Sequence, residues 1–287
     1  MHAMQIGETR QVRGVTVPSI MYGTAWKEER TRALTSEAIA CGFRAIDTAN
    51  QRKHYFEAGV GAAIAAALAS GSVTREQLFV QTKFTYQRGQ DRRLPYDSDA
   101  DLATQVQQSI DSSLEHLGVA RIDSYILHSP SRAYGVDEAD WQTWRAMEEA
   151  VRAGRVGLLG VSNIAFEQLA NLIEGVKIAP AFVQNRCFAR NRWDADVRAL
   201  CNTHDVVYQG FSLLTANRQA LSSPRILAVA RRHGKTVAQV VFRFAVESAM
   251  LPLTGTTDSA HMRQDLEIFD FTLSDEDLKT VLEVGVP

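Results

Sequence analysis

Three polar side chains stand near the ends of successive apolar runs of the sequence, where core packing does not explain them: Asp47, Lys83 and His128. Taken singly, each has an ordinary interpretation, because such residues serve as a helix cap, a solvated charge and a structural imidazole. At equivalent positions on neighbouring strands they indicate a reaction site instead. A buried Asp or Lys is costly unless it is paired, and Asp47 with Lys83 would be such a pair.

The elements that must position these residues follow an alternating pattern. Short apolar runs rich in β-branched residues predict eight strands, at 20–25, 43–49, 78–84, 122–129, 156–163, 181–187, 206–212 and 250–256. Apolar residues at three and four spacing predict helices at 28–42, 56–71, 101–118, 137–154, 166–175, 193–205, 236–249 and 259–269.

Eight strands alternating with helices predict an α/β fold, a (β/α)8 TIM barrel, because each parallel strand needs a crossover connection. We expect one domain over residues 1–287, since no linker or low-complexity tract divides the chain. The alternative, an open doubly wound sheet, is disfavoured because no GxGxxG turn follows an early strand. Residues 11–20 predict a hairpin that closes the barrel floor, and Ser274 is the expected N-cap of a last helix.

Composition narrows the possible partners. With 45% hydrophobic residues, 22% charged residues and a net charge of -2, the chain can build a large core and has no basic excess for nucleic acid or an anionic membrane. Cys41, Cys187 and Cys201 lack metal-ligand spacing, so we expect reduced thiols and no metal. No signal peptide or membrane span is visible, which predicts a cytoplasmic protein.

The ordered motifs resemble the aldo-keto reductase superfamily. DTA (47–49), a tyrosine with EAGVG (57–61), QTKF (81–84), YILHSP (125–130) and GVSN (160–163) occur in that family's order. The resemblance runs from Gly23 to Leu278. It implies a barrel that binds a nicotinamide cofactor, acts as a monomer and reversibly reduces an aldehyde or ketone to an alcohol by direct hydride transfer.

The resemblance assigns catalytic roles that suit these residue types. Tyr55 would be the general acid, although an unperturbed phenol has a pKa of about 10. The Lys83 ammonium would lower that pKa, Asp47 would hold the lysine charged, and His128 would orient the carbonyl.

The chain departs from the family in the loop that carries the acid. The usual tyrosine lies five residues after the aspartate, a place taken here by Arg52, whereas Tyr55 lies eight after it. Three extra residues span about 10 Å when extended, and a turn can absorb them. We expect Tyr55 to reach the site; the alternative is a structural tyrosine with Lys53 or His54 in its place.

Cofactor contacts carry over position by position. Ser162, Asn163 and Gln184 match the side chains that bind the nicotinamide carboxamide, and Phe211 matches a ring that stacks on the nicotinamide. The remaining predicted cofactor contacts are Gly23, Thr24 and Asp47, with Ser212, Leu213 and Leu214 around the pyrophosphate and Gly255, Thr256, His261 and Asp265 at the adenosine.

The adenosine segment lacks the family's lysine and arginine, leaving Thr256, His261 and Arg263 there. Each of those cations is worth about 1 to 3 kcal/mol toward a 2'-phosphate. NADP(H) remains the expected cofactor, with a weaker preference over NAD(H) than the family default.

The substrate is predicted to be a small carbonyl compound held by His128, Trp26 and Tyr86. Further aromatic residues in the predicted loops, each of which could equally be a packing residue, are Tyr134, Phe188 and Trp193. Two alternatives stay open because the tyrosine loop and adenosine segment differ from the family: a redox-neutral reaction on this scaffold, and a regulatory subunit that binds nucleotide without turnover.

Overall fold

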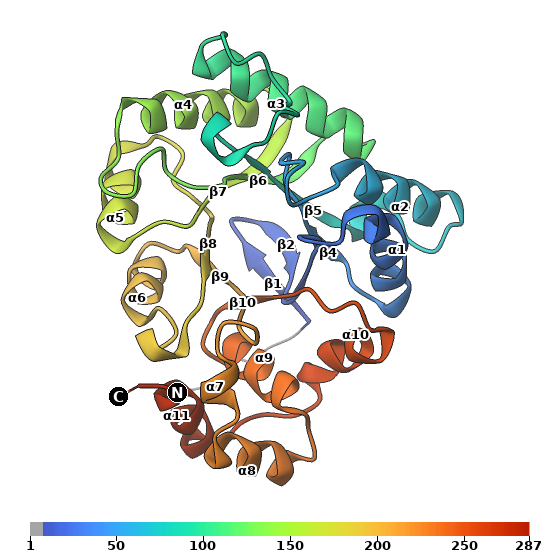
Figure 1. Cartoon of the computed structure of the whole chain (residues 1–287), viewed down its shortest axis with the longest axis vertical. Coiled ribbons are helices and arrows are strands. Elements are labelled where there is room, and N and C mark those ends of the chain that lie inside the picture. Colours follow the sequence, from blue (N-terminus) through green and yellow to red (C-terminus); the bar gives the residue numbers. More distant parts are fainter. Residues whose placement is uncertain (1–7, 287) are drawn as a thin grey trace.

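The computed structural model describes residues 8–286 and contains a closed barrel of eight parallel strands in the order β10-β3-β4-β5-β6-β7-β8-β9 (Figure 1). This confirms the predicted TIM barrel. The strands are β3 (Met21–Gly23), β4 (Ala45–Asp47), β5 (Phe79–Phe84), β6 (Ile122–Leu127), β7 (Val156–Ser162), β8 (Phe182–Arg186), β9 (Val207–Phe211) and β10 (Leu251–Thr254). Each is shorter than its apolar run, and for every strand except β5 the run continues into the loop at the barrel rim.

Helices surround the barrel in Figure 1 and bury their apolar faces against it. They are α1 (Thr31–Cys41), α2 (Glu57–Ala69), α3 (Leu102–Leu117), α4 (Glu138–Arg152), α5 (Phe166–Gly175), α6 (Ala195–Thr203), α7 (Arg218–Leu221), α8 (Pro224–His233), α9 (Val237–Glu247), α10 (Ser259–Leu266) and α11 (Asp275–Glu283). Single 3-10 turns occur at Glu28–Arg30, Arg75–Gln77, Gln87–Gly89, Ala189–Asn191 and Glu267–Phe269.

Helix ends follow the local sequence signals, and one signal was missed. Ser274 caps α11 as expected, accepting a hydrogen bond from the Asp277 amide. The sequence patterns predict no helix between residues 213 and 235, yet α7 and α8 lie there. Ser223 caps α8 and Pro224 occupies its first turn, which is a recognised start signal for a helix.

An N-terminal hairpin of β1 (Thr9–Val12) and β2 (Val15–Pro18) lies across one end of the barrel. Val12 and Val17 pack into the apolar cluster inside the strands. The Arg10 guanidinium donates to the carbonyl oxygens of Ala249 and Met250, which precede β10. The hairpin therefore closes the end at which the strands begin, and ligands must approach the barrel from the opposite rim.

Parallel strands place all their carboxyl ends at that opposite rim. Asp47 is the last residue of β4, Lys83 the last but one of β5, and Arg186 the last of β8. Among residues 8–286, no helix is both long and apolar enough to cross a lipid bilayer, and no group of three His, Cys, Asp or Glu side chains could hold a metal ion.

Replacing Val17 by Ala tests the role of the hairpin in closing the floor. Val17 is fully buried beneath the barrel, so removing two methyl groups should lower the free energy of unfolding by about 2 kcal/mol in urea denaturation. Thr16→Ala, on the exposed face of the same strand, is the control and should change it by less than about 0.5 kcal/mol. Equal losses in both variants would contradict the packing role.

Candidate active site

A buried ion pair between Lys83 and Asp47 forms the base of the site. The Lys83 Nζ lies 2.6 Å from Asp47 Oδ1 and 2.7 Å from the Thr48 carbonyl oxygen, and the two side chains are 0% and 4% exposed. Burial lowers the pKa of Lys83 and the Asp47 charge raises it. Gln81 and Gln184 donate amide hydrogens to the same Asp47 oxygen at 2.8 and 3.0 Å. These contacts fix both charges in place.

His128 follows β6 directly, and hydrogen bonds hold both its ring and its backbone carbonyl. Its Nδ1 lies 2.7 Å from the Thr85 hydroxyl oxygen, and its carbonyl oxygen accepts a hydrogen bond from the Asn163 side chain at 2.9 Å. Burial, with the nearby Lys83 charge, lowers the pKa of His128 to about 3. The imidazole is therefore neutral at physiological pH, and when Thr85 donates to Nδ1, Nε2 carries a hydrogen that can be donated to a ligand.

The Tyr55 ring lies beside both of these groups. Its centroid is 5.9 Å from that of His128, edge to face, and 5.2 Å from Lys83 Nζ. The extra loop residues are taken up by a turn, in which the amides of His54 and Tyr55 both donate to the Gln51 carbonyl oxygen. The turn is bonded to the loop that follows β3, because the Trp26 amide donates to the His54 carbonyl oxygen. Tyr55 thus reaches the rim despite the longer loop.

The electrostatic setting of Tyr55 differs from the expectation that Lys83 lowers its pKa. Burial, and then the negative charge of Asp47, raise the pKa of Tyr55. The Lys83 ammonium is engaged by Asp47 and the Thr48 carbonyl, and it makes no hydrogen bond to the phenol. In this state Tyr55 carries its proton across the physiological pH range.

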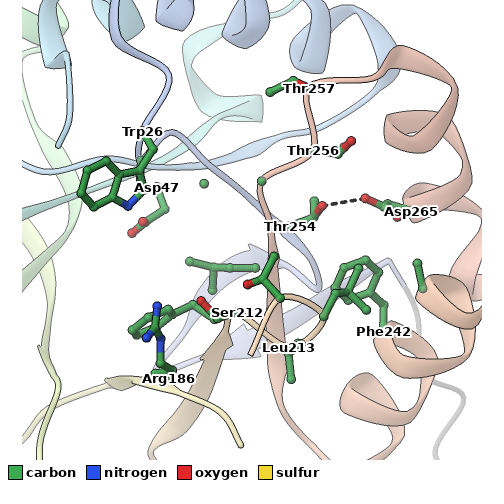
Figure 2. A pocket seen from close by; sticks show the side chains of 18 of the residues that line it. Trp26, Asp47, Arg186, Ser212, Leu213, Phe242, Thr254, Thr256, Thr257 and Asp265 are labelled. Atoms are coloured by element: carbon green, nitrogen blue, oxygen red, sulfur yellow. Dashed lines mark hydrogen bonds between the residues drawn. The ribbon is translucent and has the colours of Figure 1, made fainter. Parts of the chain in front are cut away.

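A cavity of about 640 Å³ opens at the rim above these groups (Figure 2). Its walls include Asp47, Tyr55 and His128. They also include the following residues that the sequence patterns single out: Gly23, Trp26, Ser162, Asn163, Gln184, Phe211, Ser212, Leu213, Leu214, Gly255, Thr256, His261 and Asp265. Residues from seven of the eight barrel strands or the loops after them therefore meet in one space.

Several predicted site residues lie elsewhere. Thr24 is buried beside the cavity, where its hydroxyl donates to the Asp47 carbonyl oxygen at 2.9 Å. Tyr86 is buried with its hydroxyl near Asp140 and Thr143, outside the cavity lining. Lys83 lies beneath the cavity floor, fully covered.

The other loop aromatics also fail to form a mouth. Trp193 is 0% exposed and donates to the Val281 carbonyl oxygen, so it is a core residue. Tyr134 is 89% exposed and lies outside the lining, as does Phe188, whose ring faces the Arg190 guanidinium. Of the aromatic residues predicted at the mouth, only Trp26 lines the cavity; it is 71% exposed and lies against His54 with the ring centroids 3.9 Å apart.

Two cations in the lining were not predicted. Lys27 is buried and its Nζ donates to the Gly255 carbonyl oxygen at 2.8 Å; burial lowers its pKa to about 8. Arg186 is exposed at the end of β8. The sequence held a signal for each of them. Lys27 follows Trp26 in a loop at a strand end. Arg186 lies two residues after Gln184, so strand alternation places the side chains of Gln184 and Arg186 on the same face.

The neighbourhood of Asp265 completes one end of the cavity. The Thr254 hydroxyl donates to its carboxylate at 2.6 Å, the bond drawn in Figure 2. Burial raises the pKa of Asp265 to about 6. Beside it, His261 is the one basic side chain among the lining residues that α10 supplies.

Comparison with known proteins finds relatives over nearly the whole chain. A model of the aldo/keto reductase family matches residues 19–285. The aldo-keto reductase AKR2E4 of Bombyx mori is 29% identical over 93% of this chain and 89% of that protein. Morphine 6-dehydrogenase of Pseudomonas putida is 29% identical over 95% and 90%.

Solved structures agree with the sequence relatives. An aldo/keto reductase from Brucella melitensis superposes with a TM-score of 0.80 at 27% identity, covering 96% of this chain and 98% of that one. The silkworm reductase AKR2E5 in complex with NADPH superposes with a TM-score of 0.82 at 27% identity, covering 97% and 88%.

Removing one member of the buried ion pair should be strongly destabilising. Asp47→Asn leaves the Lys83 charge buried without a counter-ion, so we expect the free energy of unfolding to fall by about 3 to 5 kcal/mol in urea denaturation. The double variant Asp47→Asn/Lys83→Met should lose less free energy of unfolding than the sum of the losses in the two single variants. Glu138→Gln, which breaks an exposed pair with Arg145, is the control and should have a much smaller effect. Additive losses would show that the pair is not coupled.

The low pKa of His128 predicts a pH dependence. A histidine in the unfolded chain titrates at about 6.5. Between that pH and 3 the unfolded chain is protonated at His128 and the folded chain is not, so the free energy of unfolding should fall as the pH drops from 6.5 toward 3. His128→Asn should reduce this loss between pH 7 and 5 in urea denaturation. In the wild type, a His128 ring resonance titrating near pH 6.5 by NMR would contradict the assignment.

Proposed function

The chain belongs to the aldo/keto reductase family, and we propose that it uses NADP(H) to reduce an aldehyde or ketone reversibly to an alcohol, with Tyr55 as general acid. The observation that carries the proposal is the convergence of Tyr55, His128 and the Lys83–Asp47 pair at one rim cavity. NADP-bound relatives of the same fold support the choice of chemistry.

The residues present suit a nicotinamide cofactor. Bound there, the cofactor would supply the hydride. Phe211 offers an apolar ring in the same lining as Gln184 and Ser162, whose polar groups suit a carboxamide. Lys27 offers a buried ammonium next to Gly255, where a pyrophosphate can be neutralised.

In the proposed reaction the chain's own groups bind the carbonyl and supply the proton. The neutral His128 donates a hydrogen bond from Nε2 to the carbonyl oxygen and fixes its direction. Negative charge develops on that oxygen as hydride arrives, and the protonated Tyr55 phenol transfers its proton there. The Lys83 ammonium stabilises the phenolate left behind, which lowers the effective pKa of Tyr55 during the step.

The adenosine end of the cavity supports only a modest preference for NADPH. His261 is the one basic side chain that α10 supplies to the lining, and Asp265 of the same helix places a carboxyl group near it. Arg263 of α10, expected at the adenosine, lies outside the cavity lining with its guanidinium 3.9 Å from Cys41 Sγ. We therefore propose that NADPH binds within about tenfold of NADH, which corresponds to about 1.4 kcal/mol.

Cofactor binding and turnover test the proposal together. Calorimetric titration with NADPH and NADH should give saturable binding, and absorbance of the reduced cofactor should fall when benzaldehyde is added. Binding of neither nucleotide would overturn the proposal. Binding without oxidation across a panel of aldehydes would favour the redox-neutral or regulatory alternatives.

Tyr55→Phe tests the assigned acid. Loss of the phenol proton should lower kcat by at least about 100-fold, while the Kd for NADPH stays the same because the ring is kept. Tyr134→Phe, at an exposed position outside the cavity, is the matched control and should keep full turnover. A Tyr55→Phe enzyme with wild-type kcat would show that another group donates the proton.

A further inference from the structure

One charged group in the catalytic cavity has no partner among residues 8–286. Four lining residues carry a carboxyl, ammonium or guanidinium group. Asp47 pairs with Lys83, Asp265 accepts from Thr254, and Lys27 donates to the Gly255 carbonyl oxygen. Arg186, in contrast, makes no ion pair or hydrogen bond through its guanidinium with any residue from 8 to 286.

The backbone of Arg186 is fixed even though its side chain is exposed. It is the last residue of β8, in register with Phe211 of β9, and the next amide, that of Cys187, donates to the Phe211 carbonyl oxygen at 3.1 Å. Gln184, two residues earlier on the same strand, points inward and reaches Asp47. Strand alternation therefore directs Arg186 to the same side, and Figure 2 shows its guanidinium directed into the cavity.

An unpaired guanidinium at this place can serve a ligand. It is planar, always charged, and presents paired N–H donors that match the two oxygens of a carboxylate or the oxygens of a phosphate. It shares the cavity with Tyr55 and His128, the groups assigned to the reacting carbonyl. Trp26 adds an apolar surface to the same lining, suited to the body of such a ligand.

We propose that Arg186 determines substrate specificity, so that the preferred substrate is a carbonyl compound that also carries an oxyanion group, either a carboxylate or a phosphate. This rests on the proposed carbonyl reduction. Arg186 binds the anionic group while the carbonyl oxygen lies between Tyr55 and His128. No carboxylate side chain in the cavity lining competes for it, since Asp47 and Asp265 are both already bonded.

Matched pairs of aldehydes test this proposal with NADPH as cofactor. The carboxylate pair is 4-carboxybenzaldehyde and its methyl ester, and the phosphate pair is glyceraldehyde 3-phosphate and glyceraldehyde. We expect the wild type to favour the charged member of at least one pair by about tenfold in kcat/KM, equivalent to about 1.4 kcal/mol. The difference should appear mainly in KM and shrink as salt is raised. Which pair shows it distinguishes carboxylate from phosphate.

Arg186→Gln should reduce that ratio to near 1, and Arg186→Lys should keep part of it. Arg190→Gln is the control: this arginine is exposed four residues later, over the Phe188 ring and outside the lining, and its loss should leave the ratio unchanged. An unchanged ratio in Arg186→Gln would overturn the proposal. So would an equal loss for charged and neutral aldehydes with a raised Kd for NADPH, which would assign Arg186 to the cofactor.

Ligand binding separates failure of this proposal from failure of the proposed reaction. Calorimetric titration of the NADP-saturated protein with benzoate and with benzamide does not depend on turnover. If no aldehyde is reduced, benzoate binding that is lost in Arg186→Gln still supports the oxyanion site while the reductase assignment falls. Equal binding of benzoate by both proteins overturns the oxyanion site.

Discussion

The site depends on a charge pair that the interior would otherwise exclude. Lys83 and Asp47 are both buried, and each alone would cost several kcal/mol in a medium of low polarity. The barrel makes the pair possible because β4 and β5 are parallel neighbours that end at one rim. Two glutamine amides then bind the carboxylate oxygen that faces the lysine. The rim cavity lies above this fixed pair, and Asp47 and Gln184 both line it.

Much of the fold and part of the site could be predicted from the sequence, for identifiable reasons. The alternation of apolar runs and amphipathic segments reports the barrel directly, and a polar residue that ends such a run must lie at its rim. Side chains in loops carry no such periodicity, which is why Tyr86 and Trp193 were expected at the mouth and lie in the packed interior. Lys27 and Arg186 were not predicted, although the position of Lys27 in a strand-end loop and the alternation of β8 at Arg186 both indicate the rim.

The loop that carries Tyr55 shows why spacing alone is a weak guide to catalytic geometry. Its additional residues form a turn around the Gln51 carbonyl oxygen and so add little reach. The ring arrives beside His128 and above Lys83, but its hydroxyl is not bonded to the lysine. Burial therefore sets the resting state of the phenol, and the negative charge of Asp47 raises its pKa further.

The exposed stack of Trp26 on His54 has a practical consequence. The chain has four tryptophans, and Trp26 alone lines the cavity; Trp144 and Trp193 are sealed in the core, and Trp141 lies against Gly175 on the outer helices. A ligand that covers the indole changes its solvent contact and its emission, whereas the other three keep theirs. The intrinsic fluorescence of Trp26 therefore reports whether a ligand occupies the cavity, without a label and without turnover.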